Sequence, residues 1–303
     1  MGETQTLFKK MVIIGGGLIG SSVARAVSDH NLCDHLTIAD KNQDYLNEIN
    51  SLDICDEVIS DLPKAVNGAD FVLICVPVGA FEVVLNEIKD HVEAGAIISD
   101  VGSVKTHVND FMFDLMPDNV FVIPGHPIAG TEKSGPKAGF AQLFKGRWMI
   151  LTPRQGYYEQ AALDEKIKTL KNFWERCGSK VEIMDEVHHD DVLAMTSHLP
   201  HLVAFSVMNT AAEMEEETRE EILKFSAGGF RDFTRVAASD PTMWRDVFLS
   251  NKKAMLPLLQ RFVEDLTILQ KHIRQSNGDA LFDYFTKAKS IRSDMNFDET
   301  EKK

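Results

Sequence analysis

Residues 11–28, MVIIGGGLIGSSVARAVS, carry the main evidence for how this chain folds. The apolar run 11–14 predicts a buried strand, and the amphipathic run 18–28 predicts a helix. The turn between them contains the pattern Gly-x-Gly-x-x-Gly, formed by Gly15, Gly17 and Gly20. This pattern in a strand–turn–helix context predicts a dinucleotide-binding fold.

Each glycine of the turn is expected to have its own physical role. Gly15 permits a tight turn, Gly17 lets the backbone approach a pyrophosphate, and Gly20 lets the helix pack closely on the strand. The free N–H groups and the dipole of the helix start favour phosphate. We therefore predict a cofactor site at these glycines and at the intervening Leu18 and Ile19. The alternative is a glycine-rich turn that binds no ligand.

Asp40 predicts which dinucleotide binds. It follows the apolar run 36–39, about 20 residues beyond the last glycine, where an acid binds the ribose 2′-hydroxyl of NAD. Its carboxylate would repel the 2′-phosphate of NADP, so we expect NAD to be preferred and NADP to bind less well. Lys41 is expected to soften this exclusion.

Short apolar runs alternate with amphipathic ones through the first half of the chain. Apolar strands separated by helices indicate a parallel sheet covered on both faces. Further strands are expected at residues 71–76, 97–100, 120–123, 148–151 and 180–184. Because ligands of such sheets lie beyond the carboxyl ends of the strands, Val76, Pro77 and Ser103 should line the nicotinamide end of the cofactor. The alternative for Ser103 is an N-cap of the following helix.

The sequence pattern changes after about residue 185, where helical periodicity replaces the strand-like runs. Apolar residues recur at helical spacing over residues 190–214 and 242–273, and Pro257 is expected to kink or divide the second run. We therefore predict three parts. Residues 1–184 form a Rossmann-type NAD-binding domain, residues 185–292 an all-helical domain, and residues 293–303 a polar tail.

The composition limits the classes of partner. A chain of 303 residues with a net charge of −14 lacks the basic surface that nucleic acids and acidic membranes require. No window approaches the roughly 20 apolar residues of a membrane span, and the first ten residues do not resemble a signal peptide. The four cysteines are scattered, which fits a reducing compartment. We expect a cytoplasmic protein that binds neither nucleic acid nor membrane.

His126 is the best candidate for a catalytic base. It begins the segment HPIAGTEKSG, residues 126–135, shortly after the expected strand 120–123. An imidazole titrates near neutral pH. The small and polar residues that follow, including Thr131, suit a loop around a small ligand. The alternative is a structural histidine bonded at a strand end.

A second group of histidines lies in the segment SHLPH, residues 197–201. His198 and His201 are three residues apart in a helical pattern, so they share one face. Paired histidines suggest zinc, but no third ligand has suitable spacing, and we predict ligand contact and internal hydrogen bonds with no metal. His188 and His189 are expected to be capping or surface groups.

The net negative charge means that an anionic ligand would need local positive groups. The segment GGFRDFTR, residues 228–235, places Arg231 and Arg235 four residues apart on one helical face. Guanidinium groups suit bidentate carboxylate recognition, so both are candidates for substrate binding. The alternative is a set of surface salt bridges with Asp232, Asp240 or Asp246.

Five segments together resemble the prephenate dehydrogenase family, which includes cyclohexadienyl and arogenate dehydrogenases of tyrosine biosynthesis. They are the glycine-rich turn, DVGSVK (100–105), GHPIAGTEKSG (125–135), SHLPH and GGFRDFTR. The resemblance extends from about residue 10 to residue 292. It implies an NAD-dependent oxidative decarboxylation that converts prephenate to 4-hydroxyphenylpyruvate. It also implies that the helical domain binds substrate and forms a homodimer.

The resemblance further implies roles for individual residues. His126 would accept the proton of the ring hydroxyl, with Ser103 hydrogen-bonded near it. Arg235 would anchor the ring carboxylate. The other substrate contacts that we predict are His201, Thr131, Arg231 and Trp244.

Three other functions remain open on the sequence. An arogenate-preferring enzyme would recognise an amine in place of the keto group, and the sequence does not show which group would meet it. A 3-hydroxyacid or 6-phosphogluconate-type dehydrogenase would need a catalytic lysine on the first long helix, yet residues 190–214 contain no lysine. A non-catalytic NAD-sensing protein would need the glycine turn but neither His126 nor Arg235.

Overall fold

A computed structural model describes residues 6–214 and 216–295 of the chain. The chain divides into two compact units, residues 1–251 and residues 252–303. The first unit contains the sheets and every candidate site residue, and the second is a pair of helices.

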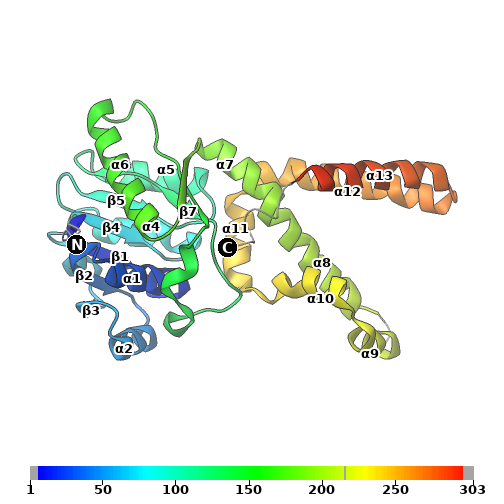
Figure 1. The fold of residues 1–303 in the computed structure, drawn as a ribbon, viewed down its shortest axis with the longest axis horizontal. Coiled ribbons are helices and arrows are strands. Elements are labelled where there is room, and N and C mark those ends of the chain that lie inside the picture. Colours follow the sequence, from blue (N-terminus) through cyan, green and yellow to red (C-terminus); the bar gives the residue numbers. More distant parts are fainter. Residues whose placement is uncertain (1–5, 215, 296–303) are drawn as a thin grey trace. The chain divides into compact units, whose positions relative to one another are not determined.

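The larger sheet of the first unit has six parallel strands in the order β3-β2-β1-β4-β5-β6 (Figure 1). The strands are β1 (Phe8–Ile14), β2 (Cys33–Ala39), β3 (Glu57–Ile59), β4 (Phe71–Ile74), β5 (Ile97–Asp100) and β6 (Phe121–Val122). This order is that of dinucleotide-binding folds, and it reverses direction between β1 and β4, where such folds bind their ligand. The predicted Rossmann-type fold is confirmed.

Side chains of the central strands alternate between two buried clusters, one on each face of the sheet. Met11 and Ile13 of β1 enter one cluster, whereas Val12 and Ile14 enter the other. Such alternation is expected of a strand buried on both faces. The first face is covered by α1 (Leu18–His30), α2 (Gln43–Leu52) and α6 (Gln160–Arg176), and the second by α3 (Leu62–Val66), α4 (Phe81–Ile88) and α5 (Thr106–Leu115).

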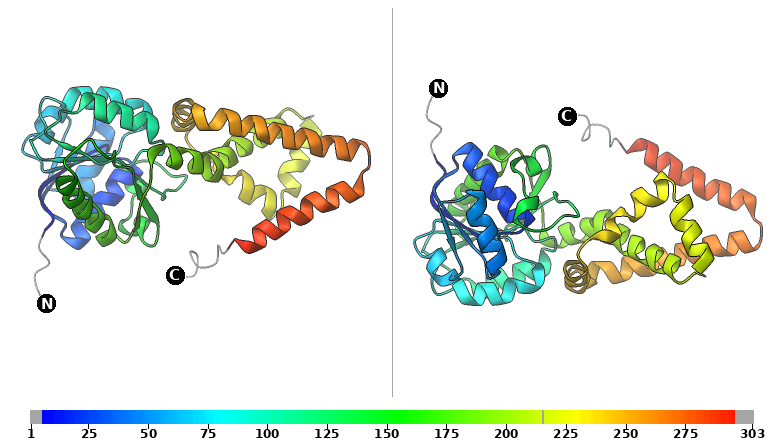
Figure 2. Two further views of the ribbon diagram at one scale, coloured as in Figure 1. Left: turned by 90° about the horizontal axis from the view of Figure 1, so that it is seen from above. Right: turned by 90° about the horizontal axis from the view of Figure 1, so that it is seen from below.

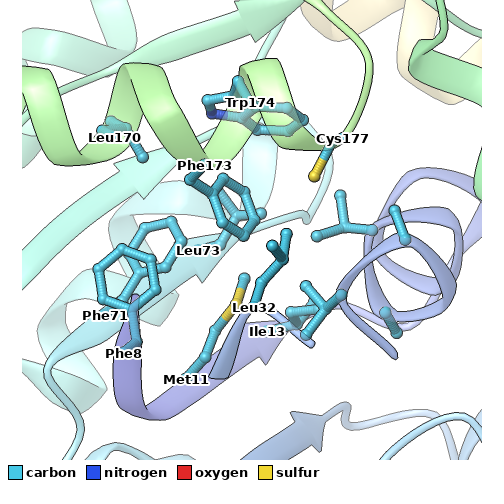
Figure 3. Packing of buried hydrophobic residues seen from close by; sticks show 14 of the residues in the cluster. Phe8, Met11, Ile13, Leu32, Phe71, Leu73, Leu170, Phe173, Trp174 and Cys177 are labelled. Carbon is cyan, nitrogen blue, oxygen red and sulfur yellow. The ribbon is translucent and has the colours of Figure 1, made fainter. Parts of the chain in front are cut away.

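The first cluster is rich in aromatic rings (Figure 3). The ring centroids of Phe8 and Phe71 are 4.6 Å apart, and Phe173 of α6 meets Phe71 edge-on at 5.2 Å. Trp174 packs beside Phe173 and is fully buried. Truncating one such ring in a packed core costs about 3–5 kcal/mol. The aromatic rings therefore hold α6 firmly against the sheet.

Three further strands form a separate sheet. β7 (Gly125–Pro127) pairs antiparallel with β8 (Trp148–Leu151), and β8 pairs parallel with β9 (Lys180–Ile183). The expectation that β8 and β9 extend the parallel sheet was therefore wrong. The chain leaves the first sheet at Pro124, which has no N–H to continue the ladder.

Helices dominate the first unit from residue 186 onward. α7 (Glu186–Leu193) continues through a π-helical turn (Ala194–His198) into α8 (Leu199–Ala212). The remaining helices of this unit are α9 (Glu216–Phe225), α10 (Gly228–Thr234) and α11 (Pro241–Ser250). Pro257 does not divide the run 242–273, since the break lies at Asn251, whose buried side-chain amide is hydrogen-bonded to the carbonyl of Asp190 and to His198.

The second unit consists of α12 (Lys252–Arg274) and α13 (Gly278–Asp294), joined by a short turn (Figure 2). α12 runs continuously through Pro257. Asn277 caps α13 by accepting a hydrogen bond from the N–H of Ala280 at 3.1 Å. Residues 296–303 of the predicted tail lie outside the described residues. Among the described helices, none is both long enough and apolar enough to cross a membrane.

Candidate active site

The glycine-rich turn joins the end of β1 to the start of α1. Gly15 has a φ of +103°, and a Cβ there would lie 2.6 Å from the carbonyl oxygen of Cys75. A Cβ on Gly20 would overlap the carbonyl oxygen of Gly15, so only glycine lets α1 pack this closely. A Cβ on Gly17, by contrast, would meet no described atom within 4 Å. This open space in front of the helix start fits a bound pyrophosphate.

Asp40 follows β2 at the same edge of the sheet. Its carboxylate accepts hydrogen bonds from the N–H of Gly16 at 2.7 Å and from the N–H of Asn42 at 2.8 Å. The negative charge is therefore fixed against the glycine-rich turn. Lys41 is held by an ion pair to Glu87, with 2.6 Å between Nζ and Oε2. That pair directs the cation of Lys41 to another acid, which limits its ability to offset Asp40.

The other predicted cofactor residues lie at the same end of the sheet. Leu18 and Ile19 are half-buried in the first turn of α1. β4 ends at Ile74, and Val76 and Pro77 follow it after Cys75. Ser103 is half-buried in the loop after β5.

The start of α5 is capped by a residue far away in the sequence. The N–H groups of Lys105 and Thr106 donate to the two carboxylate oxygens of Asp190, at 2.7 and 2.9 Å. The N-cap position of α5 is Lys105, so the alternative role of Ser103 as a helix cap was wrong. Asp190 lies on α7, and its carboxylate therefore ties α7 to the nucleotide-binding sheet.

His126 lies in β7 itself and is a half-buried residue. Its Nδ1 is 2.9 Å from Nε2 of His189, and Nδ1 of His189 is 2.9 Å from Oδ1 of Asp190. Burial, with the nearby His189 and Lys105, holds the pKa of His126 well below its usual range. His126 is therefore a neutral base at physiological pH.

The prediction that His189 is a capping or surface group was wrong. Its side chain is fully buried. Burial is tolerated because one ring nitrogen is hydrogen-bonded to His126 and the other to Asp190. His188, its neighbour on α7, is exposed as predicted.

A buried ion pair supports the strand that carries His126. Lys105 Nζ contacts the carboxylate of Asp100 and donates to the carbonyl of Gly125 at 2.6 Å. Asp100 in turn accepts from the N–H of Gly125 at 2.9 Å. Both charged side chains are fully buried. The pair therefore fixes the backbone at the residue before His126.

His198 completes a cluster of buried histidines. The amide nitrogen of Asn251 lies 3.1 Å from its Nδ1 and donates to the carbonyl of Asp190 at 3.0 Å. Burial lowers the pKa of His198 to about 4. Its Nε2 has no hydrogen-bond partner within residues 6–214 and 216–295. We call His126, His189, Asp190 and His198 the buried histidine cluster.

His201 lies one turn farther along, on α8, and stacks on Trp244 of α11. The two ring centroids are 3.8 Å apart, and Trp244 is buried. Nδ1 of His201 is 2.8 Å from the carbonyl of Ser197, so it is the protonated nitrogen and Nε2 is left as an acceptor. Burial lowers the pKa of His201, and the charge of Arg235 adds to this effect. Arg235 therefore lies close enough to act on His201 electrostatically.

Arg235 follows α10 and pairs with Glu132, with 3.4 Å between Nη1 and Oε2. Arg235 does form an exposed ion pair, but the partner is Glu132 and not one of the three aspartates named in the alternative. Glu132 belongs to the loop after His126, next to the exposed Thr131. Arg231 is also exposed. We call Arg231, Arg235 and Glu132 the exposed arginine group.

The side chains gathered here include two histidines and a carboxylate joined by hydrogen bonds, which suit proton transfer. Among the described residues, no group of three or more histidine, cysteine, aspartate or glutamate side chains could hold a metal ion. The four cysteines are free thiols. The neutral base, the nucleotide-binding turn and the arginines instead fit hydride transfer from an anionic alcohol.

Comparison with known proteins connects this site to a family. Residues 23–183 match the family model described as "Prephenate dehydrogenase, nucleotide-binding domain", and residues 185–287 match "Prephenate dehydrogenase, dimerization domain". A cyclohexadienyl dehydrogenase from Zymomonas mobilis is 41% identical over 95% of this chain and 96% of its own length. A prephenate dehydrogenase from Bacillus subtilis is 32% identical over 94% of this chain and 76% of its own.

Solved structures agree with these sequence matches. A prephenate dehydrogenase from Aquifex aeolicus, in complex with hydroxyphenyl propionate and NAD⁺, superposes with a TM-score of 0.85 at 31% identity, covering 97% of this chain and 99% of that one. A Synechocystis arogenate dehydrogenase gives a TM-score of 0.77 at 25% identity, covering 94% and 99%. From these matches and from the nucleotide-binding fold, the chain belongs to the prephenate dehydrogenase family.

Proposed function

We propose that this protein is an NAD-dependent dehydrogenase that converts prephenate to 4-hydroxyphenylpyruvate with loss of CO₂. The observation that carries the proposal is the neutral imidazole of His126, held in a hydrogen-bonded cluster beside a dinucleotide-binding sheet. An alcohol oxidised by hydride transfer needs such a base within reach of its hydroxyl.

The cofactor would lie along the carboxyl edge of the six-stranded sheet. Its pyrophosphate would meet the glycine-rich turn, and Asp40 would meet the ribose hydroxyls. The remaining cofactor residues that we propose are Leu18, Ile19, Val76, Pro77 and Ser103. NAD supplies the hydride acceptor, and the protein supplies orientation.

The protein would catalyse the reaction chiefly by taking up one proton. The hydride leaves ring C4 with both electrons, and the proton of the C4 hydroxyl passes to Nε2 of His126. The bond to the departing carboxylate would then supply the electron pair that makes the ring aromatic, and the resulting phenolate oxygen would take a proton back to give the hydroxyphenyl product and neutral His126. A well-placed general base is worth roughly 10²–10⁴ in rate. Arg235 would anchor the ring carboxylate, and Ser103, Thr131, His201, Arg231 and Trp244 would contact the substrate.

Two finer statements belong to the same proposal. The Zymomonas mobilis relative, named a cyclohexadienyl dehydrogenase, supports the use of arogenate as a second substrate. The match to a dimerization domain supports a homodimer formed through the helical region. Leu256, Ile273, Phe282 and Phe285 of α12 and α13 are at least half exposed, and a second subunit would cover such apolar side chains. We further propose that the protein works in the cytoplasm.

Steady-state rates with prephenate and with arogenate, each with NAD and with NADP, test the proposal. We expect NAD reduction with prephenate, weaker turnover with arogenate, and a lower kcat/KM with NADP. An absence of NAD reduction with both substrates would rule out the proposed function.

A further inference from the structure

Three side chains of the buried histidine cluster form a continuous chain that ends in a carboxylate. His126 Nδ1 lies 2.9 Å from His189 Nε2, and His189 Nδ1 lies 2.9 Å from Asp190 Oδ1. His189 is fully buried between the other two. Hydride transfer itself requires a single base, so His189 has a different role from that of His126.

The protons of this chain can be assigned from its buried end. Burial alone would raise the pKa of Asp190, but hydrogen bonds from His189 and from the N–H groups of Lys105 and Thr106 lower it below its usual range. Asp190 is therefore an ionised acceptor, and the proton in its bond to His189 belongs to Nδ1 of the histidine.

The donor of the hydrogen bond between His126 and His189 can then be identified. Burial lowers the pKa of His189, so this ring is neutral and carries only the proton on Nδ1. Its Nε2 is then a lone-pair acceptor, and the hydrogen of the 2.9 Å contact must come from Nδ1 of His126. A neutral His126 with its proton on Nδ1 has its free lone pair on Nε2.

We propose that His189, oriented by Asp190, is a positioning residue that fixes this tautomer of His126 and keeps Nε2 available as the base. The inference rests on the proposed function, because it assumes that His126 takes up a substrate proton. When Nε2 gains that proton, His126 becomes an imidazolium whose Nδ1–H donates to neutral His189. The negative charge of Asp190 then stabilises the positive charge from behind.

The other charges around His126 show why this support matters. Lys105 in the loop before α5 and His198 in the π-helical turn lie close enough to act electrostatically on the ring, and both lower the pKa of His126. Lys105 is itself compensated by Asp100. Asp190 is thus the carboxylate that reaches His126 through a hydrogen-bonded partner.

Three variants separate positioning from a purely structural role. His189→Phe fills the buried volume without an acceptor for His126. His189→Gln reaches the Nε2 position with a side-chain oxygen that can accept the Nδ1 hydrogen, so it should restore the tautomer. His188→Asn changes the exposed neighbour on the same helix and is the matched control.

We expect His189→Phe to lower kcat by roughly 10- to 1,000-fold, part of the worth of a general base, with KM changed less than about threefold. His189→Gln should recover most of this loss, and His188→Asn should match the wild type. Equal kcat values for the Phe and Gln variants would overturn the proposal.

A spectroscopic measurement decides the question without any turnover. Nitrogen-15 NMR of the wild-type protein should show His126 protonated on Nδ1 near neutral pH, and His189→Phe should show a mixture of tautomers. Protonation of wild-type His126 on Nε2 would refute the inference even if prephenate is turned over. Conversely, an inactive protein with the expected tautomer would count against the proposed function alone.

Discussion

The buried histidine cluster and the exposed arginine group differ in how completely one chain organises them. His189 and His198 are almost inaccessible, and the ring nitrogens of His126 and His189 are joined by hydrogen bonds of ordinary length. Arg235, by contrast, is 62% exposed, and its contact to Glu132 is 3.4 Å long. The proposed proton acceptor is therefore held by hydrogen bonds within one chain, whereas the arginines proposed to bind the substrate carboxylate are open to solvent.

The difference has a physical reason. A base must be held in one tautomer. Burial achieves this when hydrogen bonds satisfy the ring nitrogens, because the bonds offset the free energy of removing the ring from water. A guanidinium that is to bind a carboxylate gains from remaining hydrated until the substrate arrives, because a buried unpaired cation is costly. The base and the anchor should consequently respond to mutation in different ways.

The largest effect is expected from His126→Asn. Loss of the base should lower kcat by about 10²–10⁴-fold, because the asparagine amide cannot accept the hydroxyl proton. Binding of 4-hydroxyphenylpyruvate, measured by calorimetry, should change little. Residual activity near the wild-type level at neutral pH would show that the base is misassigned. His188→Asn serves as the control.

Matched carboxylate-to-amide changes should separate the two regions by stability. Asp190→Asn should lower the free energy of unfolding by about 3 kcal/mol, because an amide NH₂ would face one of the two N–H donors at the start of α5. Glu132→Gln should change it by less than about 0.5 kcal/mol, since the ion pair is exposed. Urea unfolding of both variants makes the comparison, and similar losses would contradict it.

Arg235→Ala should act mainly on binding. Removal of a charge-assisted contact to a carboxylate, worth ~1.5–3 kcal/mol, should raise KM roughly 10- to 100-fold. Stability should be unaffected. Arg261→Ala removes a similar exposed arginine from α12, which pairs with Asp265, and should leave KM unchanged. A fall in kcat alone, without a change in KM, would argue that Arg235 does not anchor the substrate.

The smallest effect concerns the pH dependence of stability. Burial lowers the pKa of His198 to about 4, whereas an unfolded histidine titrates near ~6.5. Between these values the unfolded chain binds more protons than the folded one, so the free energy of unfolding falls as the pH falls. His198→Phe should flatten this slope by up to about 1.4 kcal/mol per pH unit. Unfolding midpoints at pH 7.5, 6 and 5 test this, and an unchanged slope would contradict it.

Regular apolar patterns explain most of what could be predicted. β5 and β8 begin and end at the predicted residues, because β8 is an apolar run and β5 begins with two isoleucines and ends at Asp100 before a glycine-containing loop. β7 escaped prediction, since Gly-His-Pro has no apolar alternation and is a strand only through its pairing with β8. Tertiary pairing, rather than local preference, defines such a strand.

The histidine cluster shows the corresponding limit for the site. The sequence context predicts His126 as a base, but it predicts His189 only as a capping or surface group. A buried histidine with polar partners has the same local sequence signature as an exposed one, because its partners come from distant elements. The adjacent His189–Asp190 pair at a helix start was the available signal. Asn251 lies 61 residues from the carbonyl that it contacts, which no local pattern indicates.

The capping of α5 by Asp190 bears on how this chain is made and how it could have been rearranged. Asp190, whose carboxylate caps this helix of the nucleotide-binding region, is translated 84 residues after the first residue of the helix, Thr106. During synthesis at about 5–20 residues per second, the first N–H groups of α5 therefore lack the capping carboxylate for several seconds. A gene fusion or exchange cut between the two sequence domains would separate helix from cap, so these halves are expected to be inherited together rather than shuffled as independent modules.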